Sequence, residues 1–382
     1  MEIRRNTKIV ALLLCLMLTV GCSNKKKETV VDSLPKWAMG PFVRPEGVNP
    51  VIMPDTTTLF DCPMQGKPMK WEESDIFNPA ATVKEDKIVV LYRAEDNSAQ
   101  GIGRRTSRIG YAESTDGTTM TRRKEPVLYP AEDVAKEFEW PGGCEDPRVA
   151  VTEDGLYVML YTGWDRKTPR LMSATSRDLI HWEKQGPSFG KAYDGRFKDF
   201  ASKSASIVTT EKEGQLVIEK VNGKYFMYWG EKAVYAATSE DLVNWEPLLD
   251  QEGELLKLAV PREGYFDSAL TECGPPAVKT KEGIVLIYNG KNKKHNEGGD
   301  AAYPEGAYCA GQFLFDVNDP CKVLGRLDKP FFYPEAEFEK SGQYVDGTVF
   351  TEGLVLYKGN YYLYYGCADS QVAVAVYNPK IN

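Results

Sequence analysis

Three features of the sequence predict an all-β fold, and specifically a five-bladed β-propeller. Five short strands rich in apolar and aromatic residues recur, a second motif repeats between them, and no segment has the pattern of a long amphipathic helix. A repeat of roughly 60–70 residues with about four strands per unit is typical of propeller blades. Five copies therefore predict five blades.

The five strands have the character of the second strand of a β-hairpin. Most begin after a turn signal such as Asn222 followed by Gly223, and turns of this kind join two antiparallel strands. In chain order, the strands cover residues 87–92, 156–161, 224–229, 284–288 and 361–365.

The second motif defines the outer part of a blade. Residues 174–182 reappear as residues 237–245, and residues 112–117 are a shorter copy. In both long copies a strand ends in Ser, a turn containing Asp follows, and Trp182 or Trp245 closes the motif. Because both Trp residues belong to the repeat, we expect them in the core.

Three strands open on a proline step, at residues 78–79, 146–147 and 274–275. The first strand of each propeller blade lines the central axis, so the residues around each proline should face one shared funnel. This arrangement brings together residues that are far apart in the sequence, namely Asn78, Glu145, Asp146, Glu272 and Cys273.

Composition restricts the function. The formal net charge is -8, which disfavours a nucleic-acid partner because no basic surplus is available to neutralise phosphates. The chain has 2 His, and no His, Cys or carboxylate cluster has the spacing of a metal site, so we expect no cofactor. Carboxylates are the plentiful acid–base groups, and paired carboxylates cleave glycosidic bonds. Glycoside chemistry is favoured, with a sugar-binding lectin as the alternative.

The N-terminus resembles an export signal. Basic residues precede an apolar run over residues 9–20, which is too short to span a bilayer. The run ends at Gly21 and Cys22, which resemble a bacterial lipobox with Cys22 as the lipidated residue. Plain secretion and a buried N-terminal helix are the alternatives.

This interpretation divides the chain into three parts. Residues 1–21 are the signal peptide, residues 22–36 are a polar tether, and residues 37–382 are a single catalytic propeller domain. We expect an exported lipoprotein, in the periplasm or at the cell surface, that meets a membrane only through its lipid anchor.

Residues 143–149, Gly-Cys-Glu-Asp-Pro-Arg-Val, resemble the G-x-EDPR signature of glycoside hydrolase family 130. That family comprises mannoside phosphorylases and β-1,2-mannosidases on five-bladed propellers, so the resemblance implies a β-mannoside oligosaccharide as substrate. Supporting similarities extend over most of the chain, at residues 77–79, 92–93, 111–117, 176–182 and 364–369.

The resemblance points to the hydrolytic branch. Asn289 stands where the phosphorylases usually have a His that helps to hold phosphate, and Glu231 and Glu272 match the two Glu of the mannosidases. It implies an inverting β-1,2-mannosidase, with this pair flanking the bond and a water while Asp146 binds the sugar. The alternatives are a phosphorylase that forms mannose 1-phosphate, a glycan-binding lipoprotein without activity, and, for Glu231, a surface pair with Lys232.

The resemblance also implies a set of substrate-binding residues, namely Asn78, Arg93, Asp146, Arg148, Asn289 and Asp369. Several have a structural alternative. Asp146 and Arg148 could form an ion pair that locks a blade, Asn78 and Arg93 could satisfy loop carbonyls, and Asp369 could belong to a tight turn.

Overall fold

The computed structural model describes residues 34–380, and this part of the chain is nearly all β, which confirms the all-β part of the predicted fold. Residues 1–21, Cys22 and most of the predicted tether lie outside the described residues. Within residues 34–380, no helix has the length and apolar character needed to cross a membrane. The helical elements described are α1 (Lys136–Glu139) and three single turns, η1 (Ala192–Gly195), η2 (His295–Glu297) and η3 (Glu337–Glu339).

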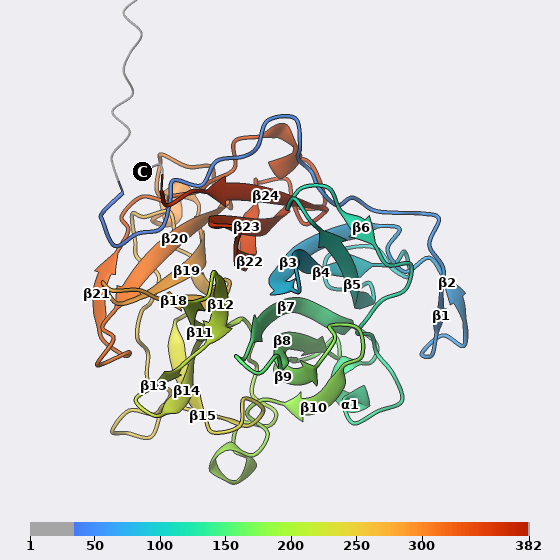
Figure 1. Cartoon of the computed structure of the whole chain (residues 1–382), viewed down its shortest axis with the longest axis horizontal. Coiled ribbons are helices and arrows are strands. Elements are labelled where there is room, and N and C mark those ends of the chain that lie inside the picture. The colour runs from blue at the N-terminus through green and yellow to red at the C-terminus, as the bar shows by residue number, and fades with distance from the viewer. Residues whose placement is uncertain (1–33, 381–382) are drawn as a thin grey trace, which may run out of the picture. The chain divides into compact units, whose positions relative to one another are not determined.

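Most strands belong to five antiparallel units that follow one another along the chain (Figure 1). The first unit contains β3 (Asp75–Lys84), β4 (Lys87–Glu95), β5 (Ser107–Ser114) and β6 (Thr121–Arg122). The second contains β7 (Gly143–Val151), β8 (Tyr157–Trp164), β9 (Pro169–Ser176) and β10 (Glu183–Pro187). The third contains β11 (Ala205–Lys212), β14 (Lys224–Trp229), β15 (Tyr235–Ser239) and β16 (Trp245–Pro247).

The last two units follow the same plan. The fourth contains β17 (Leu270–Cys273), β18 (Ala277–Lys279), β19 (Ile284–Lys291), β20 (Tyr308–Phe315) and β21 (Val323–Arg326). The fifth contains β22 (Val349–Tyr357), β23 (Asn360–Cys367) and β24 (Gln371–Tyr377). Short strands complete the set, namely β1 (Phe60–Cys62), β2 (Lys67–Met69), β12 (Gln215–Ile218) and β13 (Lys220–Val221). The five strands expected from the sequence lie in β4, β8, β14, β19 and β23.

The apolar core lies between neighbouring units. Leu91 of β4 and Met159 of β8 share one buried cluster, and other clusters join each later unit to the next. Ile76 of β3 and Val374 of β24 share a further cluster, so the fifth unit also packs with the first. The sheets therefore close into a ring, with β3, β7, β12 and β22 near its centre (Figure 1).

The start of the described chain fastens this ring. Val43 and Ile52 form antiparallel bridges with Val376 and Val372 of β24. The edge strand of the last unit is thereby paired with a segment that precedes the first unit, which covers backbone groups that would otherwise face solvent.

The repeated Trp motif has the same geometry in both copies. The indole N–H of Trp182 donates to the carbonyl of Leu179 at 3.1 Å, and that of Trp245 donates to Leu242 at 3.2 Å. Trp245 is buried as expected, whereas Trp182 is half-buried. The repeat therefore marks equivalent turns after β9 and β15.

Candidate active site

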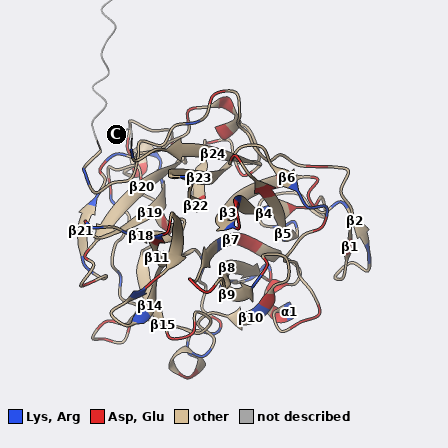
Figure 2. Cartoon of the chain, viewed as in Figure 1, with Lys and Arg blue, Asp and Glu red and all other residues tan. Residues whose placement is uncertain are grey.

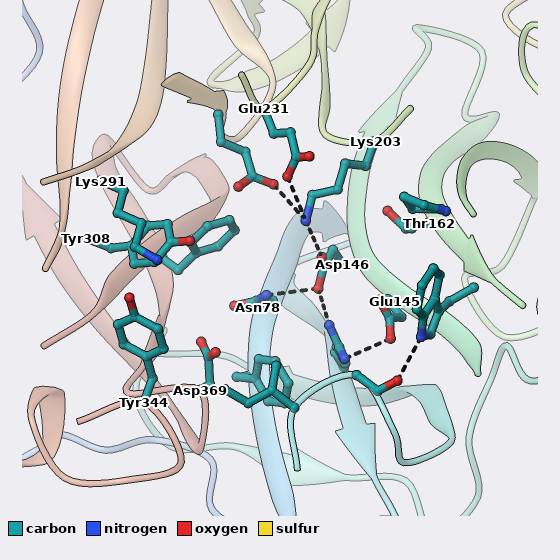
Figure 3. Close-up of a pocket in the computed structure, with 18 residues that line it drawn as sticks. Asn78, Glu145, Asp146, Thr162, Lys203, Glu231, Lys291, Tyr308, Tyr344 and Asp369 are labelled. Carbon is teal, nitrogen blue, oxygen red and sulfur yellow. Dashed lines mark hydrogen bonds and ion pairs between the residues drawn. The ribbon is translucent and has the colours of Figure 1, made fainter. Parts of the chain in front are cut away.

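A cavity of about 440 Å³ opens at the centre of the ring (Figure 3). Acidic and basic residues meet in this region, around the central strands β3 and β7 (Figure 2). Six predicted site residues line the cavity, namely Asn78, Arg93, Asp146, Glu231, Glu272 and Asp369. The structure therefore brings together predicted positions from all five units of the fold.

Two β-bulges turn polar side chains into the cavity. The register of β3 shifts between Phe77 and Pro79, and that of β7 shifts between Glu145 and Arg148. Asn78 and Asp146 lie in these bulges with left-handed φ angles of 47° and 48°. Such backbone conformations are unfavourable for non-glycine residues and cluster at functional sites. The Asn78 amide donates to Asp146 Oδ1 at 2.8 Å, which ties the two bulges together.

Arg93 is the centre of a buried charge cluster. Its guanidinium donates to Glu95 at 2.7 Å, to Glu145 at 2.8 Å and to Asp146 at 2.9 Å. Burial raises the pKa of Glu145 to about 7 even though Arg93 opposes the shift. Burial acts in the same direction on Asp146, but Arg93, Lys203 and Arg148 together outweigh it and hold the pKa of Asp146 well below its usual range. Asp146 is therefore an anion at neutral pH.

Lys203 joins three carboxylates from different units. Its ammonium lies 3.2 Å from Glu272 Oε1, 3.7 Å from Asp146 Oδ2 and 3.8 Å from Glu231 Oε2 (Figure 3). Lys203 was not among the residues predicted from the sequence. Its only sequence signal is position, because it lies two residues before β11 (Ala205–Lys212), the inner strand of the third unit.

Backbone hydrogen bonds place Glu231 beside Glu272. The amide of Thr271 donates to the carbonyl of Glu231 at 2.9 Å, and the amide of Cys273 donates to Gly230 at 3.0 Å. These bonds join the turn after β14 to β17. Gly230 is required here because its φ is 112° and an added Cβ would lie 2.3 Å from the carbonyl oxygen of Ala233.

The two Glu side chains have different surroundings. The Glu231 side chain is 40% exposed, whereas the Glu272 side chain is 3% exposed and accepts a hydrogen bond from the Ser204 hydroxyl. Burial raises the pKa of Glu272, although Lys203 and Arg148 oppose the shift. Glu272 therefore retains a proton to higher pH than an ordinary glutamic acid.

Arg148 is placed differently from the sequence prediction, because it lies beneath the cavity instead of lining it. Its guanidinium donates to the carbonyls of Asp146 and Cys273, both at 3.0 Å, and forms an ion pair with Glu352 at 2.9 Å. Arg148 thus has the contacts of a structural residue. The carboxylate that pairs with it is that of Glu352, and not that of Asp146 as in the structural alternative.

Asn289 also departs from the prediction of a sugar ligand. It is fully buried in β19, and its side chain is bonded to Thr351 in three ways. The amide donates to the Thr351 carbonyl at 3.1 Å, while the amide oxygen accepts from the Thr351 N–H and hydroxyl, both at 2.8 Å. Asn289 therefore fastens the fourth unit to the fifth and does not reach the cavity.

Asp369 lines the cavity from the turn between β23 and β24, with a left-handed φ of 51°. Burial raises its pKa to about 7, against the opposing effect of Arg93. The aromatic side of the cavity was not predicted from the sequence. Residues that line it there are Trp164, Lys291, Tyr308, Tyr344 and Phe350.

Among residues 34–380, no group of three or more His, Cys, Asp or Glu side chains has the arrangement of a metal site. The cysteines in this range are free, namely Cys62, Cys144, Cys273, Cys309, Cys321 and Cys367. The cavity is thus a carboxylate-rich site with three cations, Arg93, Lys203 and Lys291, on its wall.

Comparison with known families agrees with this geometry. Residues 44–381 match the model of glycoside hydrolase family 130, which is described as beta-1,4-mannooligosaccharide phosphorylase. The chain belongs to glycoside hydrolase family 130. The predicted resemblance is therefore confirmed. This family 130 protein is an enzyme of a family that acts on mannosides.

Similar proteins of family 130 include phosphorylases. A 1,2-beta-oligomannan phosphorylase of Thermoanaerobacter sp. (strain X514) is 32% identical over 342 residues, which cover 87% of this chain and 96% of that protein. A beta-1,2-mannobiose phosphorylase of the same strain is 31% identical over 322 residues, which cover 81% of this chain and 92% of that protein.

Some solved structures are more similar to this chain in sequence than these two phosphorylases are. A putative glycosidase from Bacteroides thetaiotaomicron VPI-5482 is 65% identical, with a TM-score of 0.90 over 91% of this chain and 99% of that one. A second structure, 61% identical with a TM-score of 0.90, covers 91% of this chain and 96% of its own. Its description states that the family of mannoside phosphorylases contains glycoside hydrolases that target beta-1,2 mannosidic linkages in Candida mannan.

Proposed function

We propose that this family 130 protein is an inverting β-1,2-mannosidase that cleaves β-mannoside oligosaccharides with water. The observation that carries the proposal is the convergence of Glu231 and Glu272 on the ammonium of Lys203 in one cavity, beside Asp146. The relative that is 61% identical supports the hydrolytic reaction, since its description names glycoside hydrolases that act on β-1,2 linkages.

The separation of the two Glu side chains is compatible with paired carboxylate chemistry. Both carboxylates contact one nitrogen, so the contacting oxygens lie no more than about 7 Å apart. Inverting glycosidases place their carboxyl groups roughly 6.5–9.5 Å apart and retaining enzymes about 5–5.5 Å apart. The upper limit of about 7 Å reaches the lower end of the range for inverting enzymes. The anomer of the product distinguishes an inverting from a retaining enzyme.

We assign the base to Glu231 and the acid to Glu272. Glu231 is the more exposed of the pair, so a water can reach it from the cavity mouth. Glu272 is buried and has a raised pKa, which suits a group that must hold a proton for the leaving oxygen. Asp146 is held as an anion and is available to accept a hydrogen bond from a sugar hydroxyl.

A mannoside phosphorylase is the second candidate, and the phosphorylases at 31–32% identity favour it. The replacement of a phosphate-holding His by Asn289 is weaker support for hydrolysis than the sequence suggested. Asn289 lies outside the cavity, and its side chain is hydrogen-bonded to Thr351. The replacement of His by Asn therefore affects the cavity wall only indirectly.

Incubation with β-1,2-mannobiose, with and without phosphate, tests the proposal. A hydrolase releases mannose without phosphate, and inversion yields the α-anomer first, which NMR detects before mutarotation. Glu231→Gln and Glu272→Gln should each lower kcat by about 10²–10⁴. Mannose 1-phosphate formed only in the presence of phosphate would instead identify the phosphorylase. Mannoside binding without turnover, unchanged in both variants, would identify a binding protein.

An activated substrate tests the assignment of roles. An aryl β-mannoside has a leaving group that needs little protonation, so it should restore turnover by the variant that lacks the acid. We expect recovery for Glu272→Gln and none for Glu231→Gln. Recovery for Asp146→Asn, with none for Glu272→Gln, would move the acid to Asp146.

The architecture and the location belong to the same proposal. We interpret the five units as the blades of a β-propeller, with residues 37–382 as one catalytic domain. We also propose export and lipidation at Cys22, which would bring the enzyme to glycans outside the cytoplasm. Metabolic labelling with a fatty acid should mark the native chain and leave Cys22→Ala unlabelled.

A further inference from the structure

A groove at the outer edge of the ring lies apart from the active-site cavity. It has a volume of about 380 Å³ and lies where the first and second units meet, between the segment after β6 and the turn that leads into β10 (Figure 1). Among residues 34–380, none lines both this groove and the cavity. We call it the rim groove. Its lining includes Phe60, Tyr129, Trp182, Arg123, Asp133 and His181.

Trp182 distinguishes the rim groove from the equivalent place in the third unit. The repeated motif ends in Trp182 and in Trp245, and both indole N–H groups are bonded alike. Trp245 is 1% exposed, because Phe189 and Phe197, from the segment between β10 and β11, pack in the same buried cluster. Trp182 is only half-buried and lines the rim groove. The second unit therefore leaves open an indole that the third unit covers.

Hydrogen-bonding groups without internal partners surround this indole. Within residues 34–380, the Arg123 guanidinium makes no hydrogen bond, and its ion pair with Glu125 is long, at 3.7 Å. The Tyr129 hydroxyl also has no hydrogen-bond partner in this part of the chain. His181 contacts Asp178 through Nδ1 at 2.7 Å, and its Nε2 has no partner among the described residues. A guanidinium, a phenol and an imidazole can together donate to and accept from several hydroxyl groups.

The charges of the rim groove favour a neutral ligand. Lys184 lines the groove, but its ammonium lies 2.6 Å from Glu139 and 3.1 Å from Asp133. Arg123 likewise has Glu125 as its counter-charge. With each cation matched by a carboxylate, the groove has no surplus charge to attract an ion. Aromatic rings with a few polar groups suit a sugar, whose C–H face is apolar and whose hydroxyls form hydrogen bonds.

The rim groove is also connected to the surroundings of the cavity. Asp133 lines both the groove and a neighbouring hollow, which includes Trp140 and Val134, a side chain that is 68% exposed. Two residues after Trp140, Gly142 packs so closely on Trp164 that an added Cβ would lie 2.3 Å from its ring. Trp164 lines the cavity. A chain held in the rim groove therefore stays near the active site, which raises the local concentration of substrate.

We propose that the rim groove is a second carbohydrate-binding site, which takes a segment of a neutral β-mannoside chain. Trp182 supplies a surface on which a sugar ring stacks, and Arg123, Tyr129 and His181 supply hydrogen bonds to its hydroxyls. Such a site favours long or branched glycans, because one part can be held while another is cleaved. The inference rests on the proposed function for the identity of the sugar.

Fluorine NMR of protein labelled with 5-fluorotryptophan observes the two sites separately. The chain has 7 Trp, of which Trp164 reports on the cavity and Trp182 on the rim groove. Trp164→Phe and Trp182→Phe assign the two resonances. A β-1,2-linked mannohexaose is titrated into the Glu272→Gln protein, in which turnover is blocked. We expect both resonances to shift saturably, each with its own binding curve. A Trp182 resonance that does not move overturns the inference, whatever happens at Trp164.

Arg123→Ala, made in the same Glu272→Gln protein, tests the polar contacts without disturbing the core. It should weaken the affinity measured at Trp182 at least threefold and leave the curve at Trp164 unchanged. Arg196→Ala is the matched control, because Arg196 is similarly exposed and pairs with Glu254 at 3.5 Å. Equal weakening in both variants, or none in either, overturns the assignment of Arg123 to the site.

The same titration separates this inference from the proposed function. A shift at Trp182 with none at Trp164 supports the rim groove and counts against mannoside binding in the cavity. A shift at Trp164 alone has the opposite meaning. A Trp182 resonance that moves with protein concentration in the absence of sugar identifies a contact between two copies of the chain, and that result also overturns the inference.

Discussion

The ammonium of Lys203 lies 3.2 Å from a carboxylate oxygen of Glu272, at the point where the third and fourth units of the ring meet. The same ammonium is 3.8 Å from Glu231 and 3.7 Å from Asp146. One cation therefore offsets part of the repulsion among three carboxylates. Lys203 lowers the pKa of Asp146 and that of Glu272, so the protonation states of these two groups should depend on it.

Lys203→Met should lower kcat/KM for β-1,2-mannobiose by about 10²-fold, as expected when a preorganised charge is lost from an active site. Loss of the cation favours the neutral form of nearby carboxylates, so the pKa values of Asp146 and Glu272 should rise. Because Glu272 is the proposed acid, the basic limb of the pH–rate profile should then move to higher pH. Lys198→Met is the control, since Lys198 is half exposed and pairs with Glu137 at 3.5 Å. An unshifted profile would show that Lys203 acts on substrate alone.

Asp369 predicts a pH dependence of stability. Its pKa is about 7 in the folded protein, above the usual value near 3.8, so the folded state binds more protons between these pH values. The free energy of unfolding therefore falls as pH rises through this window, and the full penalty is present above about pH 7. Asp369→Asn should stabilise the protein by about 1–3 kcal/mol at pH 8 and by little at pH 4.5, after allowance for solvent screening.

Denaturant melts of wild type and Asp369→Asn at the two pH values measure this difference. Asn tolerates the left-handed backbone at this position, so the substitution should not strain the turn. Asp61→Asn, at an exposed position on β1, controls for general effects of charge. A stabilisation that is equal at pH 4.5 and pH 8 would argue against a raised pKa at Asp369.

Much of the fold could be predicted because its signals are local. Hairpin turns and strand composition located β4, β8, β14, β19 and β23, and the Trp182 and Trp245 motif located the turns after β9 and β15. The convergence of Asn78, Asp146 and Glu272 could also be predicted, because the inner strand of each repeat has the same place relative to the axis.

The side-chain partners could not be predicted, because they depend on packing across units. Arg148 and Asn289 are polar residues beside the cavity, yet the side chain of each donates a hydrogen bond to a backbone carbonyl of a neighbouring unit. Lys203, Lys291 and Tyr308 lie in no repeated motif, and only the ring brings them to the cavity. Sequence order contains no signal for such contacts between distant strands.

The ion pair of Arg148 with Glu352 predicts a large effect on stability. Both side chains are buried, and the guanidinium also holds the carbonyls of Asp146 and Cys273. Glu352→Leu leaves the buried Arg148 guanidinium without this partner, which should cost about 3–5 kcal/mol of unfolding free energy. The exposed pair of Arg177 and Asp154 is the matched comparison, where removal should cost no more than about 1 kcal/mol.

A double-mutant cycle measures the coupling of this pair by urea denaturation. Arg148→Met combined with Glu352→Leu should recover part of the stability that Glu352→Leu alone loses, because neither polar side chain then remains buried without its partner. If the two single losses simply add in the double variant, Arg148 is stabilised by the backbone carbonyls and not by Glu352.

A substitution at Gly230 tests how strongly catalysis depends on the backbone turn beside Glu231. Its φ is 112°, and a Cβ at this position would come within 2.3 Å of the Ala233 carbonyl oxygen, so an alanine must displace the turn. Gly223, in the turn before β14, also has a left-handed φ, of 87°, but an added Cβ there meets nothing within 4 Å. Each alanine should cost about 1–2 kcal/mol through φ alone, and only Gly230→Ala should add a clash.

The two variants therefore separate stability from catalysis. Gly223→Ala should lose stability and keep its kcat for β-1,2-mannobiose, whereas Gly230→Ala should also lose about tenfold or more in kcat, because small displacements of a catalytic group are costly. The assay is run well below both melting temperatures, so that the folded fraction is equal. Equal kcat in the two variants would mean that Glu231 keeps its position without the bonds from β17, and that the turn is not what sets the spacing of the catalytic pair.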